Sequence, residues 1–240
     1  MVTSTLRPPV QPGEAAPSFA LPWVDREGTV SLSDYRGKPL FLALFRGIYC
    51  PFCRRAIDRL AASSEALRAI GVEALGIVAT KPENARLYFR HRPTRMPLAA
   101  DPELHTHRAY GLPKPELTPD LLHAMQTVPV NPTGELPQPL PPMEASPALD
   151  RIHGFKPTEI DEQDRQRQTP QLQGEFLVDR DGIVRWVNIE CAKEGVAGIG
   201  KVPAEEEILS AARSLPGRPA RLAETLGRAR SWWKHLGGRA

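Results

Sequence analysis

The sequence predicts an α/β protein whose central mixed sheet is flanked by helices. A fully apolar run, Leu40–Phe45, is expected to form a strand buried on both faces, as parallel sheets require. It leads into Cys50 and Cys53, a Cys-x-x-Cys pair that opens a segment with helical periodicity. A second apolar run over 72–79 follows, so that strand, helix and strand form a βαβ unit.

Local signals place the elements around this unit. The helix that follows the cysteines is expected to end at Gly71, a residue suited to the left-handed conformation that closes helices. Turn, cap and periodicity signals predict the remaining elements: a hairpin with strands near Phe19 and over 30–32, a helix from Pro82, a strand over 96–100, a helix from Asp101 to Tyr110, a hairpin across Asp181-Gly182 and a helix from Pro203.

A proline-rich insertion, residues 112–173, interrupts this pattern. It holds 12 of the chain's 26 prolines. Proline removes a backbone donor and restricts the residue before it, so neither a strand nor a continuous helix is expected here. A long loop, an ordered insertion covering the body and a linker remain open, and apolar pieces over 121–125 and 152–155 favour the ordered insertion. Residues 139–142 would serve as a structural cover rather than as a polyproline ligand.

The chain is expected to form one domain, residues 17–215, with an extension at each end. Residues 1–16 are predicted to be an extended arm that packs weakly. The basic tail, residues 216–240, has six basic residues and one acidic residue. Its apolar residues, including Trp233, share one helical face. Docking on the body or pairing two protomers as a homodimer is favoured for that face over binding to anionic lipid.

Composition excludes several classes of protein. A net charge of +3 is too small to indicate a nucleic-acid partner. No run approaches 18 apolar residues, so no membrane span is expected, and the first residues lack the apolar core of a signal peptide. Three cysteines are not a secreted disulfide framework. A cytoplasmic location is the expectation.

The Cys-x-x-Cys pair carries the chemistry that the sequence indicates. Cys50 and Cys53 lie three residues apart in the first turn of one helix, where free N–H groups and the helix dipole stabilise a thiolate. Pro51, between them, suits an early helical position because its missing N–H costs nothing there. Arg46 and Tyr49 are expected to lie beside Cys50 and tune its reactivity. The pair is therefore predicted to be redox-active.

Other roles for the cysteines remain open. Zinc would need two further ligands at close spacing, for which the chain offers the pair His105 and His107. Two inert buried thiols are the other alternative. Cys191 is expected to be a structural thiol rather than a third redox centre. Arg185 is a more distant electrostatic candidate for the site, and an ordinary surface arginine on a strand is the alternative. No cofactor and no metal are predicted.

Several motifs stand in a recognisable order along the chain: Pro17-Ser18-Phe19, residues 30–40, Arg46-Gly47-Ile48-Tyr49-Cys50-Pro51-Phe52-Cys53, Asp101-Pro102 with Tyr110-Gly111, residues 171–174 and residues 176–182. Together they resemble the peroxiredoxin-like family of alkyl hydroperoxide reductases and thiol-specific antioxidants, which have a thioredoxin fold. The resemblance spans roughly residues 12–215 and is interrupted by the insertion.

The resemblance implies an antioxidant thiol-disulfide oxidoreductase. Cys50 would take the peroxidatic position, attack a peroxide and become a sulfenic acid. Cys53 would resolve this intermediate as an intramolecular disulfide, which a thioredoxin- or glutathione-type reductant would reopen. A protein disulfide is the alternative substrate.

Departures from the family pattern favour a second hypothesis. Ala43 and Gly47 stand where peroxiredoxins usually carry proline and threonine, and Gln173 lies where an arginine is expected. Leu44 stands where thioredoxins carry a buried acid, and Pro170 is a weak candidate for the proline that faces their cysteines. The alternative is a redox-sensing or partner-binding protein with little peroxidase turnover.

Overall fold

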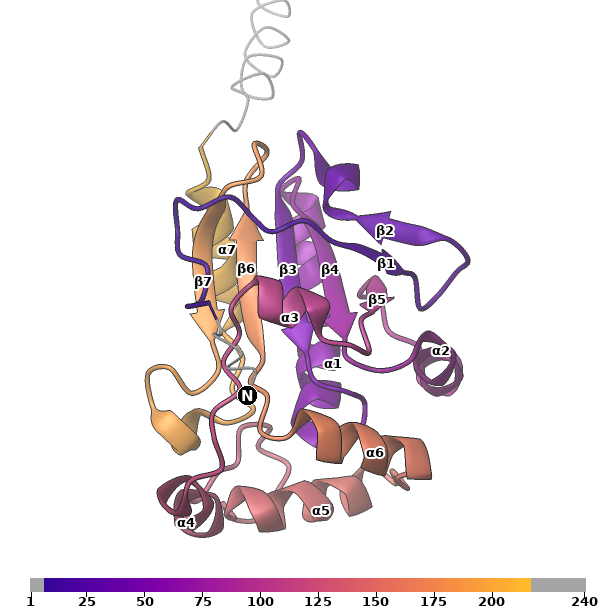
Figure 1. The fold of residues 1–240 in the computed structure, drawn as a ribbon. Coiled ribbons are helices and arrows are strands. Elements are labelled where there is room, and N and C mark those ends of the chain that lie inside the picture. Colours follow the sequence, from indigo (N-terminus) through magenta and orange to yellow (C-terminus); the bar gives the residue numbers. More distant parts are fainter. Residues whose placement is uncertain (1–6, 217–240) are drawn as a thin grey trace, which may run out of the picture.

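The computed structural model describes residues 7–216. Its centre is a five-stranded sheet with the strand order β5-β4-β3-β6-β7, in which β3, β4 and β5 are parallel and β6 and β7 are antiparallel to their neighbours (Figure 1). A separate antiparallel hairpin of β1 and β2 precedes the sheet. The strands are β1 (Ala20–Pro22), β2 (Thr29–Ser31), β3 (Leu40–Phe45), β4 (Glu73–Val78), β5 (Leu98–Ala100), β6 (Gly174–Val178) and β7 (Val184–Ile189).

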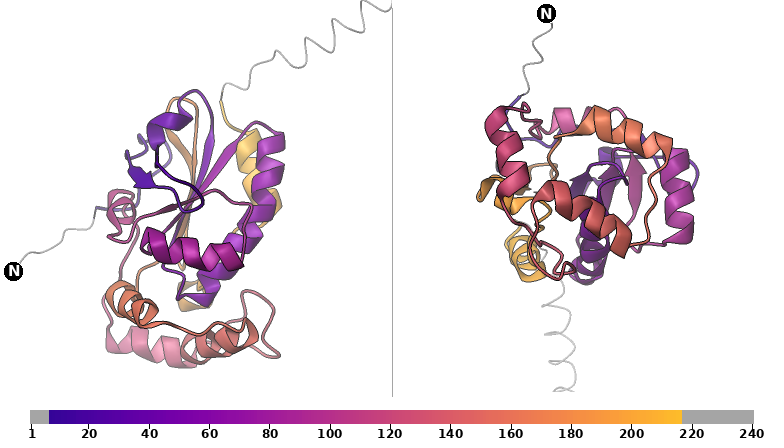
Figure 2. Two further views of the ribbon diagram at one scale, coloured as in Figure 1. Left: turned by 90° about the vertical axis from the view of Figure 1, so that its right-hand side faces the viewer. Right: turned by 90° about the horizontal axis from the view of Figure 1, so that it is seen from below.

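Helices cover both faces and one end of this sheet, which confirms the predicted α/β architecture. Helices α1 and α7 pack on one face, and α3 lies on the other. Helices α4, α5 and α6 gather at the end of the sheet where α1 begins (Figure 2). The helices are α1 (Pro51–Ala69), α2 (Pro82–His91), α3 (His105–Ala109), α4 (Pro119–Thr127), α5 (Pro142–Ile152), α6 (Glu159–Gln168) and α7 (Glu205–Arg213), with 3-10 turns at Leu32–Tyr35 and Gly195–Gly198.

Strand β3 is buried on both faces, as its apolar sequence predicts, and it divides the core in two. Because side chains alternate along a strand, Phe41 and Phe45 pack with α1 and α7. Leu42 and Leu44 face the opposite side, where they pack with Tyr110. The strand therefore fixes the position of the loop that follows it, which carries the cysteines.

The expectation that proline excludes helices from the insertion is wrong. Pro119 and Pro142 occupy the first positions of α4 and α5, where no N–H is needed. Pro147 lies inside α5. The third helix, α6, begins with a capping box in which Thr158 and Asp161 satisfy each other's backbone N–H groups. Two prolines of the insertion thus begin helices, and a third is accommodated inside one.

Most of residues 7–16 are exposed, as expected of a weakly packed N-terminal arm, but one buried side chain and several backbone hydrogen bonds attach this segment to the body. Val10 is fully buried, and its N–H donates to the Tyr110 carbonyl at 3.1 Å. Farther along, the Gly13 N–H donates to the Val184 carbonyl at 2.8 Å. The segment thus crosses the sheet face beside α3 and is held by backbone hydrogen bonds at both ends.

The predictions for most of the basic tail concern residues outside the described part of the chain. Residues 217–240 of the tail, including Trp233, lie outside the described residues. The docking, homodimer and lipid alternatives therefore stay untested. Within residues 7–216, no helix is long and apolar enough to cross a membrane.

Candidate functional site

The Cys-x-x-Cys pair lies where β3 passes into α1. Cys50 is the N-cap of α1, and its sulfur accepts a hydrogen bond of 3.2 Å from the Cys53 backbone N–H. Pro51 is the first residue of the helix, as predicted. Both cysteines are free thiols and are buried, Cys50 with 4% and Cys53 with 1% of its surface exposed. The local sequence therefore places two sulfurs within one helical turn.

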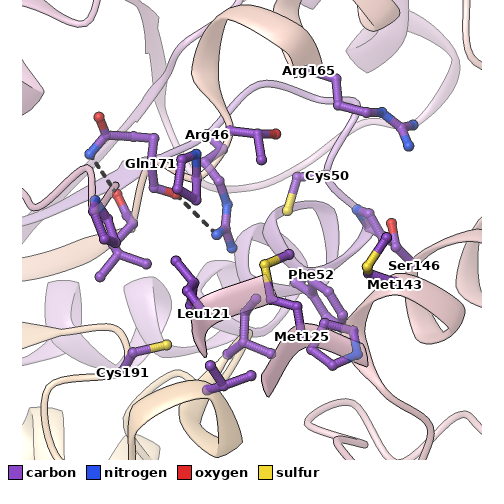
Figure 3. A pocket seen from close by; sticks show the side chains of 18 of the residues that line it. Arg46, Cys50, Phe52, Leu121, Met125, Met143, Ser146, Arg165, Gln171 and Cys191 are labelled. Carbon is purple, nitrogen blue, oxygen red and sulfur yellow. Dashed lines mark hydrogen bonds between the residues drawn. The ribbon is translucent and has the colours of Figure 1, made fainter. Parts of the chain in front are cut away.

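Arg46 connects this pair to distant parts of the chain. Its Nε–H donates to the Cys53 sulfur at 3.2 Å, and its Nη1 donates to the Gln171 carbonyl at 3.1 Å (Figure 3). Its Nη2 forms an ion pair of 2.8 Å with Glu190. The guanidinium is almost fully buried, so its charge acts on the thiols with little screening by water.

The electrostatics distinguish the two sulfurs. Burial raises the pKa of Cys50, but the Cys53 thiol, the Arg46 charge and the Cys53 backbone N–H outweigh it and lower that pKa to about 6. Burial and the neighbouring Cys50 raise the pKa of Cys53 well above its ordinary value. These surroundings therefore favour the thiolate form at Cys50 over that at Cys53 near neutral pH.

Tyr49 lies in the same turn and borders the same cavity as Cys50. Burial, followed by the nearby Cys50, raises the pKa of its phenol, which keeps the hydroxyl protonated. The Arg165 guanidinium of α6 lies 5.8 Å from the centroid of the Tyr49 ring. The structure thus brings together all four residues singled out in the sequence, Arg46, Tyr49, Cys50 and Cys53.

The loop between β3 and α1 is fixed from two sides. The Gly47 N–H donates to the Gln168 side-chain oxygen at 2.8 Å, and the Ile48 N–H donates to the Thr80 hydroxyl at 3.1 Å. A Cβ atom at Gly47 would lie 2.8 Å from the Tyr49 ring and 2.9 Å from the Thr80 Oγ1. This site therefore has no room for the threonine that peroxiredoxins usually carry at this position.

A cavity of about 480 Å³ opens beside Cys50, and its walls are mainly apolar (Figure 3). The proline-rich insertion supplies one wall of it, a role that the sequence did not predict. The side chains that line the cavity include Phe52, Leu121, Met125, Met143, Pro170, Val196 and Ile199.

The insertion is bound to the first turns of α1 by buried charge. The Arg54 Nη2 donates to Asp150 of α5 at 2.5 Å, and its Nη1 donates to the Ile48 carbonyl at 2.8 Å. The Arg54 guanidinium also lies 3.9 Å from the centroid of the Phe155 ring. One residue further on, Arg55 pairs with Glu135. The helix that carries the cysteines thus also holds the insertion.

The remaining candidates divide between the site and the surface. Pro170 follows a cis peptide bond and lines the cavity beside Cys50. Cys191 also lines the cavity, on the side opposite Cys50 (Figure 3). Burial and Glu190 raise the pKa of Cys191 to about 12, which supports an unreactive thiol. Arg185 lies outside the cavity lining and pairs with Asp179 in the last hairpin.

His105 and His107, the pair considered as zinc ligands, lie in different surroundings. His107 is fully buried, with its Nε2 3.0 Å from the Phe45 carbonyl oxygen, whereas His105 is exposed beside Asp101. In the described part of the chain, no three His, Cys, Asp or Glu side chains gather as metal ligands would.

Two buried residues of the site, Glu190 and Gln168, are not predicted from the sequence. Glu190 pairs with Arg46 across 144 positions of the chain, and Gln168 anchors Gly47 across 121. Glu190 follows the last strand directly, and Gln168 ends an insertion helix. No local pattern marks either of them, because only the folded chain brings their partners close.

Fold and site together define a thioredoxin-fold dithiol protein of the peroxiredoxin type. Residues 12–187 match the AhpC/TSA family, so the chain belongs to that family and is a peroxiredoxin-like thiol oxidoreductase.

Individual proteins of known sequence or structure agree with this assignment. The Rv2521 protein of Mycobacterium tuberculosis is 29% identical over 110 residues, which cover 46% of this chain and 68% of that protein. Peroxiredoxin Bcp of Escherichia coli is 27% identical over 104 residues, 43% of this chain and 66% of that protein. The reduced 2-Cys peroxiredoxin of Plasmodium vivax shares the fold with a TM-score of 0.54 and 16% identity, covering 86% of this chain and 82% of that one.

Proposed function

We propose that this chain reduces peroxides through Cys50 and Cys53, with Cys50 as the nucleophile and Cys53 as the resolving thiol. The observation that carries the proposal is the position of Cys50. It caps a helix, it has a pKa lowered to about 6, and it borders a cavity large enough for a substrate. The second thiol lies in the same helical turn, where a disulfide closes without a long rearrangement.

In the first step, the Cys50 thiolate attacks one oxygen of the hydroperoxide. A sulfur–oxygen bond forms, the O–O bond breaks, and the leaving alkoxide takes up a proton and departs as the alcohol. Cys50 becomes a sulfenic acid, and the peroxide is reduced by two electrons.

In the second step, Cys53 loses its proton and attacks the Cys50 sulfur. The sulfur–sulfur bond forms, and hydroxide leaves and is protonated to water. The Arg46 Nε–H, which already contacts the Cys53 sulfur, would stabilise the negative charge that develops there. A dithiol reductant of the thioredoxin type, or glutathione, then supplies two electrons and two protons to restore both thiols.

The cavity supports an organic hydroperoxide with an apolar substituent as the substrate. Hydrogen peroxide would leave most of the apolar wall in contact with water, whereas a larger substituent would bury part of it. Met143 is half-exposed at the cavity wall, so Met143→Glu tests this preference without opening the core. Leu87→Glu, an exposed position outside this cavity, is the matched control.

The decisive experiment is a stopped-flow measurement in a Cys53→Ser, Cys191→Ser background, which leaves Cys50 as the single thiol. We expect cumene hydroperoxide to oxidise Cys50 much faster than it oxidises a free thiolate, and faster than hydrogen peroxide does. Met143→Glu would lower the rate of Cys50 oxidation by cumene hydroperoxide and leave the rate with hydrogen peroxide unchanged. A Cys50 rate no greater than that of a free thiol contradicts peroxidase function.

A redox-sensing role is the second candidate, and the Arg54–Asp150 contact favours it. Oxidation of Cys50 and Cys53 would alter the first turn of α1, to which the insertion is bound. Hydrogen exchange over residues 112–173 should then differ between the oxidised and reduced protein. Identical exchange in both states would argue against the sensor.

A further inference from the structure

Glu190 is a buried carboxylate that takes no direct part in the proposed reaction steps. Its side chain is fully buried at the end of β7. One oxygen, Oε1, accepts hydrogen bonds from the Arg46 Nη2 at 2.8 Å and from the Gly200 N–H at 2.7 Å. The other, Oε2, accepts from the Gln173 N–H at 3.2 Å. Three donors thus converge on one carboxylate.

This arrangement suits an ionised carboxylate paired with an ionised guanidinium. A buried charge is stable only when it has a partner and its remaining lone pairs are satisfied, and Glu190 meets both conditions. The two backbone donors come from segments on either side of the carboxylate, before β6 and after Gly198. The backbone therefore fixes Glu190, and Glu190 in turn fixes Arg46.

The orientation of Arg46 follows from the shape of its side chain. A guanidinium is a rigid plane whose N–H directions are fixed relative to one another. With Nη2 held by Glu190 and Nη1 by the Gln171 carbonyl, the Nε–H is left pointing at the Cys53 sulfur. Without Glu190, only the contact with Gln171 would restrain the far end of the side chain, which borders the cavity.

We propose that Glu190 is a positioning residue of the dithiol site: it holds the Arg46 guanidinium against Cys53 and so keeps the positive charge beside the CxxC thiols. The inference rests on the proposed function of Cys50 and Cys53. It adds the residue that directly follows β7 to the groups that determine their reactivity.

Two explanations of the role of Glu190 can be distinguished, because they predict opposite shifts in the pKa of Cys50. In one, Glu190 positions Arg46; in the other, it acts only by its own charge. The negative charge of Glu190 by itself raises the pKa of Cys50, and the Arg46 charge lowers it. If Glu190 acted only by its charge, its neutralisation would lower the pKa of Cys50. If it positions Arg46, its loss frees the guanidinium to turn toward the cavity, and the pKa of Cys50 rises.

The test is the pH profile of Cys50 alkylation by iodoacetamide in the reduced full chain, read by mass spectrometry of the Cys50 peptide. Glu190→Gln removes the negative charge and replaces one acceptor oxygen by an NH₂ group. One of the three donors then loses its acceptor, and Arg46 loses its ion pair. We expect the midpoint to move upward by at least one pH unit, which is about a fivefold loss of rate at pH 6. Glu194→Gln, a half-exposed neighbour paired with Lys201, should leave the profile unchanged.

Two further variants complete the design. Glu190→Asp keeps the charge and shortens the reach, so an upward shift in this variant cannot come from lost charge. It also keeps the test decisive if Glu190→Gln fails to fold. In an Arg46→Met background, Glu190→Gln should cause no additional upward shift, because its effect passes through Arg46.

A downward shift in Glu190→Gln, an unchanged profile in both Glu190 variants, or an equal upward shift with and without Arg46 would overturn the proposal. Alkylation requires no peroxide. A protein that failed as a peroxidase would therefore disprove the proposed function and still give a readable answer here.

Discussion

The Nε–H of Arg46 points at the sulfur of Cys53, 3.2 Å away, although Cys50 is the thiol whose pKa is lowered to about 6. Both sulfurs lie in one helical turn, so a single guanidinium acts on both. Its charge favours the Cys50 thiolate in the resting protein. Its hydrogen bond is directed at the sulfur that must become negative when the disulfide closes. In the proposed reaction, one arginine would thereby assist Cys50 and then Cys53.

The first prediction concerns the pH dependence of the two thiols. Cys50 is protonated below its lowered pKa, so its alkylation by iodoacetamide should rise through about pH 6 and approach a plateau near pH 7.5. Cys53, whose pKa is raised, should stay unreactive over this range. Both cysteines lie in the tryptic peptide 47–54, so fragment-ion mass spectrometry assigns the label to Cys50 or Cys53. A common midpoint near that of a free thiol would contradict the assignment of roles.

Gly47→Ala should destabilise the protein by about 1–3 kcal/mol, as overpacking of a filled site does. The new Cβ would meet the buried Tyr49 ring and the Thr80 hydroxyl, neither of which can move freely. Urea unfolding measures the loss. Gly47→Thr, which introduces the usual family residue, should be at least as unstable and should not increase the rate of Cys50 oxidation. A stable variant with a faster rate would show that the loop accommodates that hydroxyl.

Arg54→Met should cost about 3–5 kcal/mol, because it leaves the buried Asp150 carboxylate without its closest partner. Arg95→Met is the control. Arg95 forms an ion pair with Glu65, but both side chains are largely exposed, so its loss should cost at most about 1 kcal/mol. Chemical denaturation of both variants gives the comparison. Equal losses would mean that burial does not distinguish the two pairs.

Glu175→Gln should change how the stability of the protein depends on pH. Burial raises the pKa of Glu175 to about 8, whereas its carboxyl in the unfolded chain titrates near 4.5. Between these values the unfolded state has lost a proton that the folded state keeps, so Glu175 makes stability fall as pH rises, by about 1.4 kcal/mol per pH unit. Glutamine cannot ionise, and it can keep the hydrogen bond from Asn188.

The corresponding measurement is urea unfolding at pH 5.5, 6.5 and 7.5. The variant should be more stable than the parent at pH 7.5, and the difference should shrink toward pH 5.5. Glu83→Gln, on the exposed surface of α2, serves as the control and should follow the parent. Parallel curves for Glu175→Gln and the parent would mean that Glu175 ionises normally in the folded protein.

Much of the fold could be predicted because its signals are local. The apolar run of β3 demands burial on both faces, and the switch to helical spacing after Cys50 predicts α1. Asp181-Gly182 predicts the last hairpin, where Gly182 adopts a φ of +81°. Within the insertion, the density of proline predicts that no continuous helix forms. The folded chain places Pro119 and Pro142 at first helical positions, where the residue before each is free to be extended, and it accommodates Pro147 inside α5.

The sequence by itself determined the redox pair, its place at the start of a helix and the family to which the chain belongs. Helix capping, strand burial and turn formation depend on neighbouring residues, so a reader of the sequence can find them. The tertiary structure alone decided that Glu190 anchors Arg46, that Gln168 anchors Gly47 and that the insertion forms one wall of the cavity. The first two contacts join residues 144 and 121 positions apart, and desolvation in the folded interior gives them their strength.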